Sequence, residues 1–380
     1  MDNKRVRYGD GYSDGLEPVY PIDVAKNGSV DALLKEYAHT AFGGRSLGEG
    51  ADVLEAAIED PECLVVCTLS GAMTVAKQGL VLCETIDRGW IQAIVSTGAL
   101  MLHGLVEGSG RTHFKYKPKM NDLDLLEAGY PRVYDTLELE KNLDDVDLIV
   151  REVVESLPED EALYSAYIMN ALGRYLDENT PEDTRAILKS CYRKGVPVYV
   201  PAFTDSELGL DIALLNQIRL KKGKKRRRFE PFLDLEHYAR LVATQKRTGI
   251  FTIGGGVPRN WAQQLGPLVD HLNHRSGKSD GERTGSGFRF HYGVRVCPEP
   301  VHWGGMSGCT YSEGVSWGKF VPQSEGGRFA EIIADATIVW PLLVRGLIER
   351  LGDEPPQKNL VPMAGNDLLV FEGSELEKPG

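Results

Sequence analysis

The sequence predicts an α/β fold of the doubly wound, Rossmann-like type, in which helices cover both faces of a mostly parallel sheet. Three observations predict it. Short apolar runs alternate with helical patterns, several of these runs end in turns rich in Gly, Ser or Thr, and neither a repeat nor a Pro/Ser-rich linker divides the chain. Of the 380 residues 42% are hydrophobic and 26% are charged, which is ordinary globular composition and allows one large α/β unit.

Two apolar runs predict the first strands. C-L-V-V-C-T-L (63–69) is nearly continuous, as parallel strands buried on both faces are, and a helix is predicted behind it over 75–89. I-Q-A-I-V-S-T-G (91–98) predicts a second strand that ends in a small-residue turn. After a polar segment rich in Asp and Lys, helices are predicted near 143–157 and 182–194.

The middle of the chain continues the alternation. V-P-V-Y-V-P-A (196–202) predicts a strand whose prolines mark its ends. A 3.6-residue period returns over 208–220, and a further helix is predicted around 236–247. It leads to the strand G-I-F-T-I-G-G (249–255).

The last part of the chain supplies two more helices and a strand. A helix is predicted over 257–274, with Pro258 in its first turn, and a strand over 288–296. A long final helix (334–352) contains Pro341, which predicts a kink or a local break.

The domain organisation follows from these elements. One domain is expected over 51–352, with a peripheral N-terminal segment over 1–50 and a peripheral C-terminal tail over 353–380.

Composition and charge exclude several classes of protein. The formal net charge of −12 argues against nucleic acid as a general partner. No run of about 18 apolar residues predicts a membrane span, and the polar N-terminus has no signal-peptide core, so a cytoplasmic protein is expected. Most of the six cysteines lie in apolar runs, which favours reduced core thiols, and their spacing predicts no metal site.

One basic run opposes the acidic balance. K-K-G-K-K-R-R-R, from Lys221 to Arg228, is typical of a solvated loop between two helices. Binding to an acidic partner or to a neighbouring subunit is the alternative.

The ends of the predicted strands indicate where a ligand binds. In a sheet of this kind, ligands bind beyond the carboxyl ends of the strands. Three of the four turns there, at 70–73, 96–99 and 254–260, are rich in Gly and Ser/Thr, and such turns let backbone N–H groups approach a phosphate. Both the G-x-G-x-x-G fingerprint and the Walker A motif are absent. Asp205, after the strand at 196–202, is placed either to hold ribose hydroxyls or to cap the next helix.

A more specific signal is E-G-V-S-W-G-K-F (313–320), which places an indole two residues before a lysine. Together with I-G-G-G-V, P-A-F-T-D-S-E-L-G and A-D-A-T-I-V-W-P-L-L-V, it resembles the deoxyhypusine synthase family. The resemblance covers about residues 60 to 350, and S-W-G-K is its most specific element.

The resemblance implies an activity and an assembly. Members of this family use NAD and transfer the aminobutyl group of spermidine to an acceptor amine. Some relatives use a lysine of a translation factor as the acceptor, and others use putrescine and make homospermidine. Members are homotetramers whose active sites form between two subunits, so the same assembly is expected here.

The resemblance also implies roles for individual residues. Lys319 matches the catalytic lysine, Trp317 the indole that lines the polyamine tunnel, and Glu313 an acidic residue near it. The positions that match cofactor-contacting residues are Ser70, Gly71, Ala72, Thr97, Gly98, Asp205, Gly254, Gly255, Gly256, Asp335 and Ala336.

The sequence departs from the family's pattern mainly on the polyamine side. Asn260 stands where deoxyhypusine-forming members carry a substrate-contacting histidine, and His103 aligns with a glutamate. Trp303 and Met306 replace two aspartates. We expect Asn260, His103 and Trp303 to contact the substrate together with Trp317 and Glu313.

Three functions stay open from the sequence. The first is an aminobutyl transferase with a small amine acceptor, similar to homospermidine synthase. The second is a deoxyhypusine synthase that modifies a protein lysine. The third is a non-catalytic NAD-binding relative, which retention of Lys319 and Trp317 disfavours.

The chemistry of Lys319 can be tested against its neighbours. An amine attacks only when it is neutral, and lowering a lysine pKa from about 10.4 to about 7–8 takes roughly 4 kcal/mol. Burial beside Trp317 acts in the required direction, and the same indole face attracts substrate ammonium groups.

Overall fold

The computed structural model of the chain describes residues 8–275 and 288–361, without the side chains of 272–275. Within this part, six parallel strands form one sheet in the order β6-β2-β1-β7-β8-β9. Their bounds are β1 (Cys63–Leu69), β2 (Ala93–Val95), β6 (Val198–Tyr199), β7 (Arg247–Ile253), β8 (Tyr292–Val296) and β9 (Arg328–Ile332). Counted along the chain, the spatial order is 3-2-1-4-5-6, the order of a doubly wound dinucleotide-binding sheet. The predicted fold class is confirmed.

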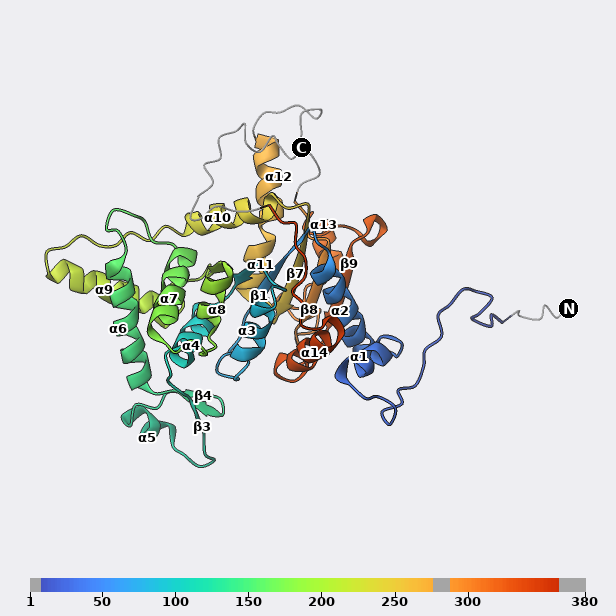
Figure 1. Cartoon of the computed structure of the whole chain (residues 1–380), viewed down its shortest axis with the longest axis horizontal. Coiled ribbons are helices and arrows are strands. Elements are labelled where there is room, and N and C mark those ends of the chain that lie inside the picture. The colour runs from blue at the N-terminus through green and yellow to red at the C-terminus, as the bar shows by residue number, and fades with distance from the viewer. Residues whose placement is uncertain (1–7, 276–287, 362–380) are drawn as a thin grey trace.

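Helices surround this sheet, and a small antiparallel sheet in the order β3-β5-β4 stands apart from it (Figure 1). The helices are α1 (Val30–Ala38), α2 (Phe42–Glu59), α3 (Gly79–Asp87), α4 (Gly98–Gly108), α5 (Asp122–Glu127), α6 (Glu140–Ser156), α7 (Ser165–Asn179), α8 (Ile187–Lys194), α9 (Glu207–Lys221), α10 (Pro231–Ala243), α11 (Gly256–Gln263), α12 (Leu265–Arg275), α13 (Tyr311–Ser316), η1 (Gln323–Glu325) and α14 (Ala336–Leu351). The small sheet comprises β3 (Phe114–Lys115), β4 (Arg132–Val133) and β5 (Thr136–Leu137).

Two apolar cores lie on opposite faces of the large sheet, because alternate residues of a strand point in opposite directions. Val65 and Cys67 of β1 join the core that contains α2, α4 and α14, whereas Leu64 and Val66 join the core that contains α10 and α11. All seven residues of β1 are buried, which explains its nearly continuous apolar sequence. In the view of Figure 1, α6, α7 and α9 gather to the left, and α1, α2 and α14 to the right.

The structure differs from the predicted elements at several places. The helix predicted over 257–274 is two helices, which meet at Gln264. Pro267 lies in the first turn of α12, and a proline clashes with the carbonyl four residues back if a helix simply continues. Pro341, by contrast, is accommodated inside α14 without ending it. The elements that were not predicted include strand β9, the small sheet and helices α1, α2, α5, α7 and α13.

The ends of the described chain pack against the domain. The expected boundary at residue 51 falls inside α2, and α1 already contacts α2 and α14. The amine of Lys358 donates to the carbonyls of Ala57, Asp60 and Cys63, at 3.0 to 3.1 Å. Residues 1–7 of the expected N-terminal segment and 362–380 of the expected tail lie outside the described residues. Within the described residues, no helix combines the length and apolar character that crossing a membrane requires.

Candidate active site

The carboxyl ends of β1 and β7 meet at the point where the strand order reverses. The backbone N–H of Ser70, just after β1, donates to Ile253 O at 3.0 Å. The Ser70 hydroxyl in turn accepts from the backbone N–H of Gly255 at 2.8 Å. These bonds join the loop after β1 to the glycine turn after β7, so the two lie side by side at the switch point, where doubly wound sheets bind ligands.

Two of the three glycines in the turn have no room for a side chain. Gly254 has a φ of +81°, and a Cβ there would lie 2.3 Å from the Ser70 hydroxyl oxygen. A Cβ on Gly255 would lie 2.9 Å from the backbone of Ser307. Gly256 is exposed and begins α11, whose N-terminus carries unpaired N–H groups and positive potential. The N–H groups of Gly254 and Gly255 already donate to Val296 O and to the Ser70 hydroxyl, so the backbone donors that face an anionic ligand are those at the N-terminus of α11.

The other residues predicted for the cofactor lie at the same edge of the sheet. Thr97 caps α4 after β2 by accepting from Leu100 N, and Asp335 caps α14 after β9 by accepting from Thr337 N. The remaining positions follow β1, β2, β6 and β9 and are Gly71, Ala72, Gly98, Asp205 and Ala336. Two capped helix N-termini and a glycine turn at one sheet edge fit the phosphates of a dinucleotide. Asp205 is exposed, and its side chain makes no hydrogen bond or ion pair with the described residues.

The segment that carries Lys319 is shaped by a short helix and its C-terminal turn. Thr310 caps α13 by accepting from the N–H of Glu313 at 3.0 Å. After the helix, Gly318 has a φ of +68°, a conformation that favours glycine. Its left-handed turn lets the N–H of Lys319 return to Gly314 O at 3.0 Å. The sequence W-G-K therefore has its glycine because the chain reverses there.

Lys319 lies in the wall of a cavity of about 970 Å³. The cavity is lined from α11, α12, the loop 305–310 and α13, and its lining includes Gly256, Asn260, Glu313, Trp317 and Lys319. The amine of Lys319 is 3.5 Å from Asn260 Oδ1, a long hydrogen bond, and 6.0 Å from the centroid of the Trp317 ring. The structure thus brings together the predicted lysine, indole, carboxylate and amide, with the glycine turn at the same cavity.

The surroundings of Lys319 favour its neutral form. Burial lowers the pKa of the Lys319 amine, and the guanidinium of Arg259 lowers it further, against the opposing charge of Glu313. Trp317 stays 67% exposed. Its indole therefore has free surface for a cationic ligand.

Two buried arginines hold the loop that leads into α13, and sequence reasoning did not find them. Arg259 donates to the carbonyls of Ser307 (3.2 Å) and Cys309 (2.8 Å). Arg295 donates to the same two carbonyls and pairs with Glu331 at 3.1 Å. Ser307 and Cys309 line the cavity, so these arginines fix part of its wall. A charged residue in an otherwise apolar strand, as Arg295 is in Y-G-V-R-V, was the available signal.

Two predicted substrate residues lie outside this cavity. Trp303 is 59% exposed and does not line it, although Gly305 and Met306 do. His103 lies on α4, where it contacts His113 and Glu138. Burial alone would raise the pKa of Glu138, but hydrogen bonds from both histidines and from Asn142 outweigh burial and hold that pKa well below its ordinary value.

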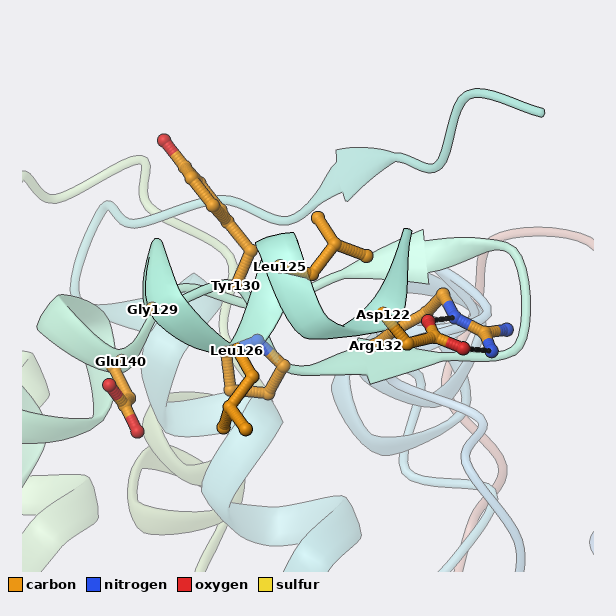
Figure 2. Close-up of a pocket in the computed structure, with 8 residues that line it drawn as sticks. Asp122, Leu125, Leu126, Gly129, Tyr130, Arg132 and Glu140 are labelled. Carbon is orange, nitrogen blue, oxygen red and sulfur yellow. Dashed lines mark hydrogen bonds and ion pairs between the residues drawn. The ribbon is translucent and has the colours of Figure 1, made fainter. Parts of the chain in front are cut away.

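A smaller cavity of about 300 Å³ lies against α5 and the small sheet. Figure 2 shows the ion pair of Asp122 with Arg132 at one end of it and Glu140 at the other. Leu125 and Leu126 contribute apolar surface. None of the residues predicted from the sequence lies there.

Comparison with known proteins gives the family. The family model described as deoxyhypusine synthase matches residues 32–347. The relatives include a "Probable deoxyhypusine synthase 2" of Methanosarcina acetivorans, 32% identical, with 88% of this chain and 91% of the relative covered. A protein of the same name from Archaeoglobus fulgidus is 30% identical over 82% of this chain and 95% of its own length.

Two further matches agree. A "Deoxyhypusine synthase-like protein" of Chlorobaculum parvum is 28% identical, with 86% of this chain and 88% of the relative covered. The crystal structure of a protein described as a putative deoxyhypusine synthase, from Entamoeba histolytica, superposes with a TM-score of 0.52 at 14% identity. It covers 86% of this chain and 96% of its own, and at this identity it supports the fold alone.

Proposed function

The chain belongs to the deoxyhypusine synthase family, and from this membership we propose that it transfers an aminobutyl group from spermidine, or a similar polyamine, to a small acceptor amine. Lys319 carries the group as an imine. The observation that supports this most is the position of the Lys319 amine, in a cavity next to the glycine turn and between Asn260 and Trp317.

The side chains of the cavity suit a polyamine. The carboxylates of Glu313 and Asp270 line the cavity, and each can pair with a substrate ammonium group. The exposed face of Trp317 adds a cation–π contact, worth on the order of 1–2 kcal/mol once the site is desolvated. Such groups orient a flexible chain with cationic ends across the Lys319 amine.

The residues at the sheet edge fit NAD, since side-chain-free glycines and helix N-termini there can hold its phosphates. When bound, NAD would supply the redox chemistry, namely removal of a hydride from the carbon beside the secondary amine of the donor and its return to the product.

Lys319 performs the transfer between these redox events. Its neutral amine adds to the oxidised carbon, and the bond from that carbon to the donor's nitrogen breaks. Diaminopropane leaves with the nitrogen and a proton, and an imine of Lys319 with the aminobutyl group remains. An acceptor amine then adds to the same carbon and Lys319 leaves as the free amine. Asn260 can accept a hydrogen bond from the attacking nitrogen, which would orient its lone pair.

The identity of the acceptor is the finer part of the proposal. Asn260, in place of the histidine expected of deoxyhypusine-forming members, favours a small amine such as putrescine. The names of the relatives favour the alternative, a lysine of a translation factor. Incubation with NAD and spermidine, with or without putrescine, distinguishes them by product mass. Homospermidine supports the proposal, and label transferred only to the protein acceptor supports the alternative. No transfer with either acceptor, while NAD binds, supports a non-catalytic NAD-binding relative.

We expect the protein to prefer NAD to NADP. Asp205 is exposed at the carboxyl end of β6, where its carboxylate would bind ribose hydroxyls and repel a 2′-phosphate. Calorimetry should give at least about tenfold tighter binding of NAD, equivalent to about 1.4 kcal/mol. Asp205→Asn should reduce the difference in affinity between NAD and NADP. Equal or tighter binding of NADP by the unaltered protein would remove Asp205 from the ribose site.

We also expect a homotetramer with active sites between subunits. Val257, Met306 and Trp317 are 51%, 62% and 67% exposed around the cavity, which is the kind of apolar surface that a second subunit covers. Light scattering should then give a mass near four times the 41.9 kDa of the chain. A monomer at micromolar concentration with full activity would contradict this assembly.

A further inference from the structure

A second group of chemically active side chains lies away from the Lys319 cavity. His103 is on α4, His113 lies between α4 and β3, and Glu138 lies between β5 and α6. The side chains of His113 and Glu138 are 0% and 2% exposed, and that of His103 is 15% exposed. Three segments thus bring two imidazoles and a carboxylate into one nearly dry place.

Three donor atoms of this group converge. Glu138 Oε2 is 3.0 Å from His103 Nδ1 and 2.8 Å from His113 Nε2, and the two ring nitrogens are 3.2 Å apart. A transition-metal ion about 2.0–2.2 Å from each ligand keeps adjacent ligands roughly 3.0 Å apart in an octahedron and roughly 3.4 Å apart in a tetrahedron. The observed triangle therefore needs little expansion to coordinate one ion.

We propose that His103 Nδ1, His113 Nε2 and Glu138 Oε2 bind one divalent transition-metal ion of the Zn²⁺ or Fe²⁺ type. Two imidazoles with one carboxylate select such ions over Mg²⁺ and Ca²⁺, which prefer oxygen ligands. Three protein ligands also leave at least one coordination position for water or another ligand. The site is separate from the aminobutyl transfer and does not depend on it.

The neighbours of the triangle already fix its carboxylate. The Asn142 side chain and the Leu139 backbone N–H both donate to Glu138 Oε1, each at 2.8 Å. These bonds occupy Oε1 and leave Oε2 directed at the two histidines. Such outer hydrogen bonds orient the ligands of metal sites.

On the Nδ1 side of the His113 ring, the ion pair of Lys77 with Glu107 would rearrange when a metal ion binds. Lys77 Nζ is 2.8 Å from His113 Nδ1 and also pairs with Glu107, so Nδ1 accepts in this arrangement and the ring proton is on Nε2. Metal binding at Nε2 requires that proton to move to Nδ1. The Lys77 side chain is 48% exposed and can turn to solvent. Glu107 Oε1, now 3.7 Å from Nδ1, would then have to move closer to accept a hydrogen bond from the Nδ1–H group.

Metal titration of the tag-free full-length protein tests this site. After treatment with a chelator, Co²⁺ should bind with one equivalent per chain, give visible ligand-field bands and be displaced by Zn²⁺. X-ray absorption of the Zn²⁺ form should show imidazole ligands at about 2.0 Å. Failure to bind Co²⁺ or Zn²⁺ at micromolar concentration would mean that the group is a hydrogen-bonded cluster only, and would overturn the proposal.

Matched variants locate the ion. His103→Ala and Glu138→Gln should each weaken Co²⁺ binding by at least about tenfold, whereas His39→Ala, at an exposed histidine outside the cluster, should not. Unchanged binding by folded His103→Ala would overturn the assignment. If the variants do not fold, X-ray absorption of the unaltered protein tests the assignment instead. A bound ion without imidazole ligands would also overturn the proposal.

Discussion

Lys319→Arg should lower aminobutyl transfer by at least about 10³-fold while NAD binding survives. The guanidinium keeps the positive charge and most of the length of the side chain, but its pKa above about 12 prevents it from becoming a neutral nucleophile. Mass spectrometry of the product measures transfer, and calorimetry with NAD measures binding. Lys246→Arg, at an exposed lysine paired with Glu62, is the matched control and should keep full activity.

Chemical trapping tests the same residue without a substitution. Borohydride added in the presence of NAD and spermidine should fix the aminobutyl group on Lys319 alone. Lys358 is an internal control, since burial lowers its pKa too, but its amine is held by three backbone carbonyls outside the cavity. Label on another lysine, or an undiminished rate in Lys319→Arg, would remove Lys319 from the mechanism.

The pH dependence of the transfer rate tests whether the pKa of Lys319 is lowered. Burial, and then the charge of Arg259, lower the pKa of Lys319 from its ordinary value of 10.5. Since only the neutral amine attacks, the single-turnover rate should rise with pH and level off at a lower pH than an exposed lysine would allow. Trp317→Ala exposes the amine and raises its pKa, so its rate should recover partly at higher pH. An alkaline limb that does not move in Trp317→Ala would argue against desolvation by the indole.

A strand could be predicted where its own sequence forms a recognisable apolar run. All seven residues of β1 are buried, so they form a nearly continuous apolar run in the sequence. The predicted range 63–69 is therefore the observed one. Strand β9, R-F-A-E-I, is a short edge strand with charged residues at its first and fourth positions, so it shows no clear alternation and its apolar side becomes recognisable only beside β8. The two-residue strands of the small sheet are too short for any period to show.

Some residues of the Lys319 cavity could be predicted from the sequence, and others could not. The resemblance selected Lys319, Trp317, Glu313 and Asn260, and the structure places all four at one cavity. Arg259 and Arg295 were missed because a buried arginine is recognised by its partners, which are carbonyls distant in the sequence.

The cluster of His103 with His113 and Glu138 was missed for the same reason. Glu138 follows His103 by 35 residues, and only the packing of α4 against the segment before α6 brings them together. The spacing of histidines and cysteines therefore indicated no metal site, although three donor atoms converge in the structure.

Arg295 is the second place where one substitution should have a large effect. Its side chain is 1% exposed, and it joins the carbonyls of Ser307 and Cys309 to the carboxylate of Glu331. Glu331 also accepts from the backbone N–H of Tyr311 at 2.6 Å, at the start of α13. One guanidinium thus connects β8, β9, the cavity loop and the helix that precedes Lys319.

Arg295→Met should therefore both destabilise the protein and loosen the cavity. The apolar side chain fills most of the space, but it leaves Arg259 as the remaining side-chain donor to the two carbonyls and leaves the half-buried Glu331 carboxylate without its charged partner, at a cost of about 3 kcal/mol. We expect a lower urea midpoint and a raised KM for spermidine, with a smaller change in NAD binding because the sheet edge stays intact. Arg345→Met is the control: that arginine is exposed on α14, four residues before its partner Glu349, and its loss should change stability by less than about 0.5 kcal/mol. Both variants must be unfolded at one protein concentration, since assembly adds to apparent stability. Equal midpoints for the two variants would show that the cavity loop is held by Arg259 alone.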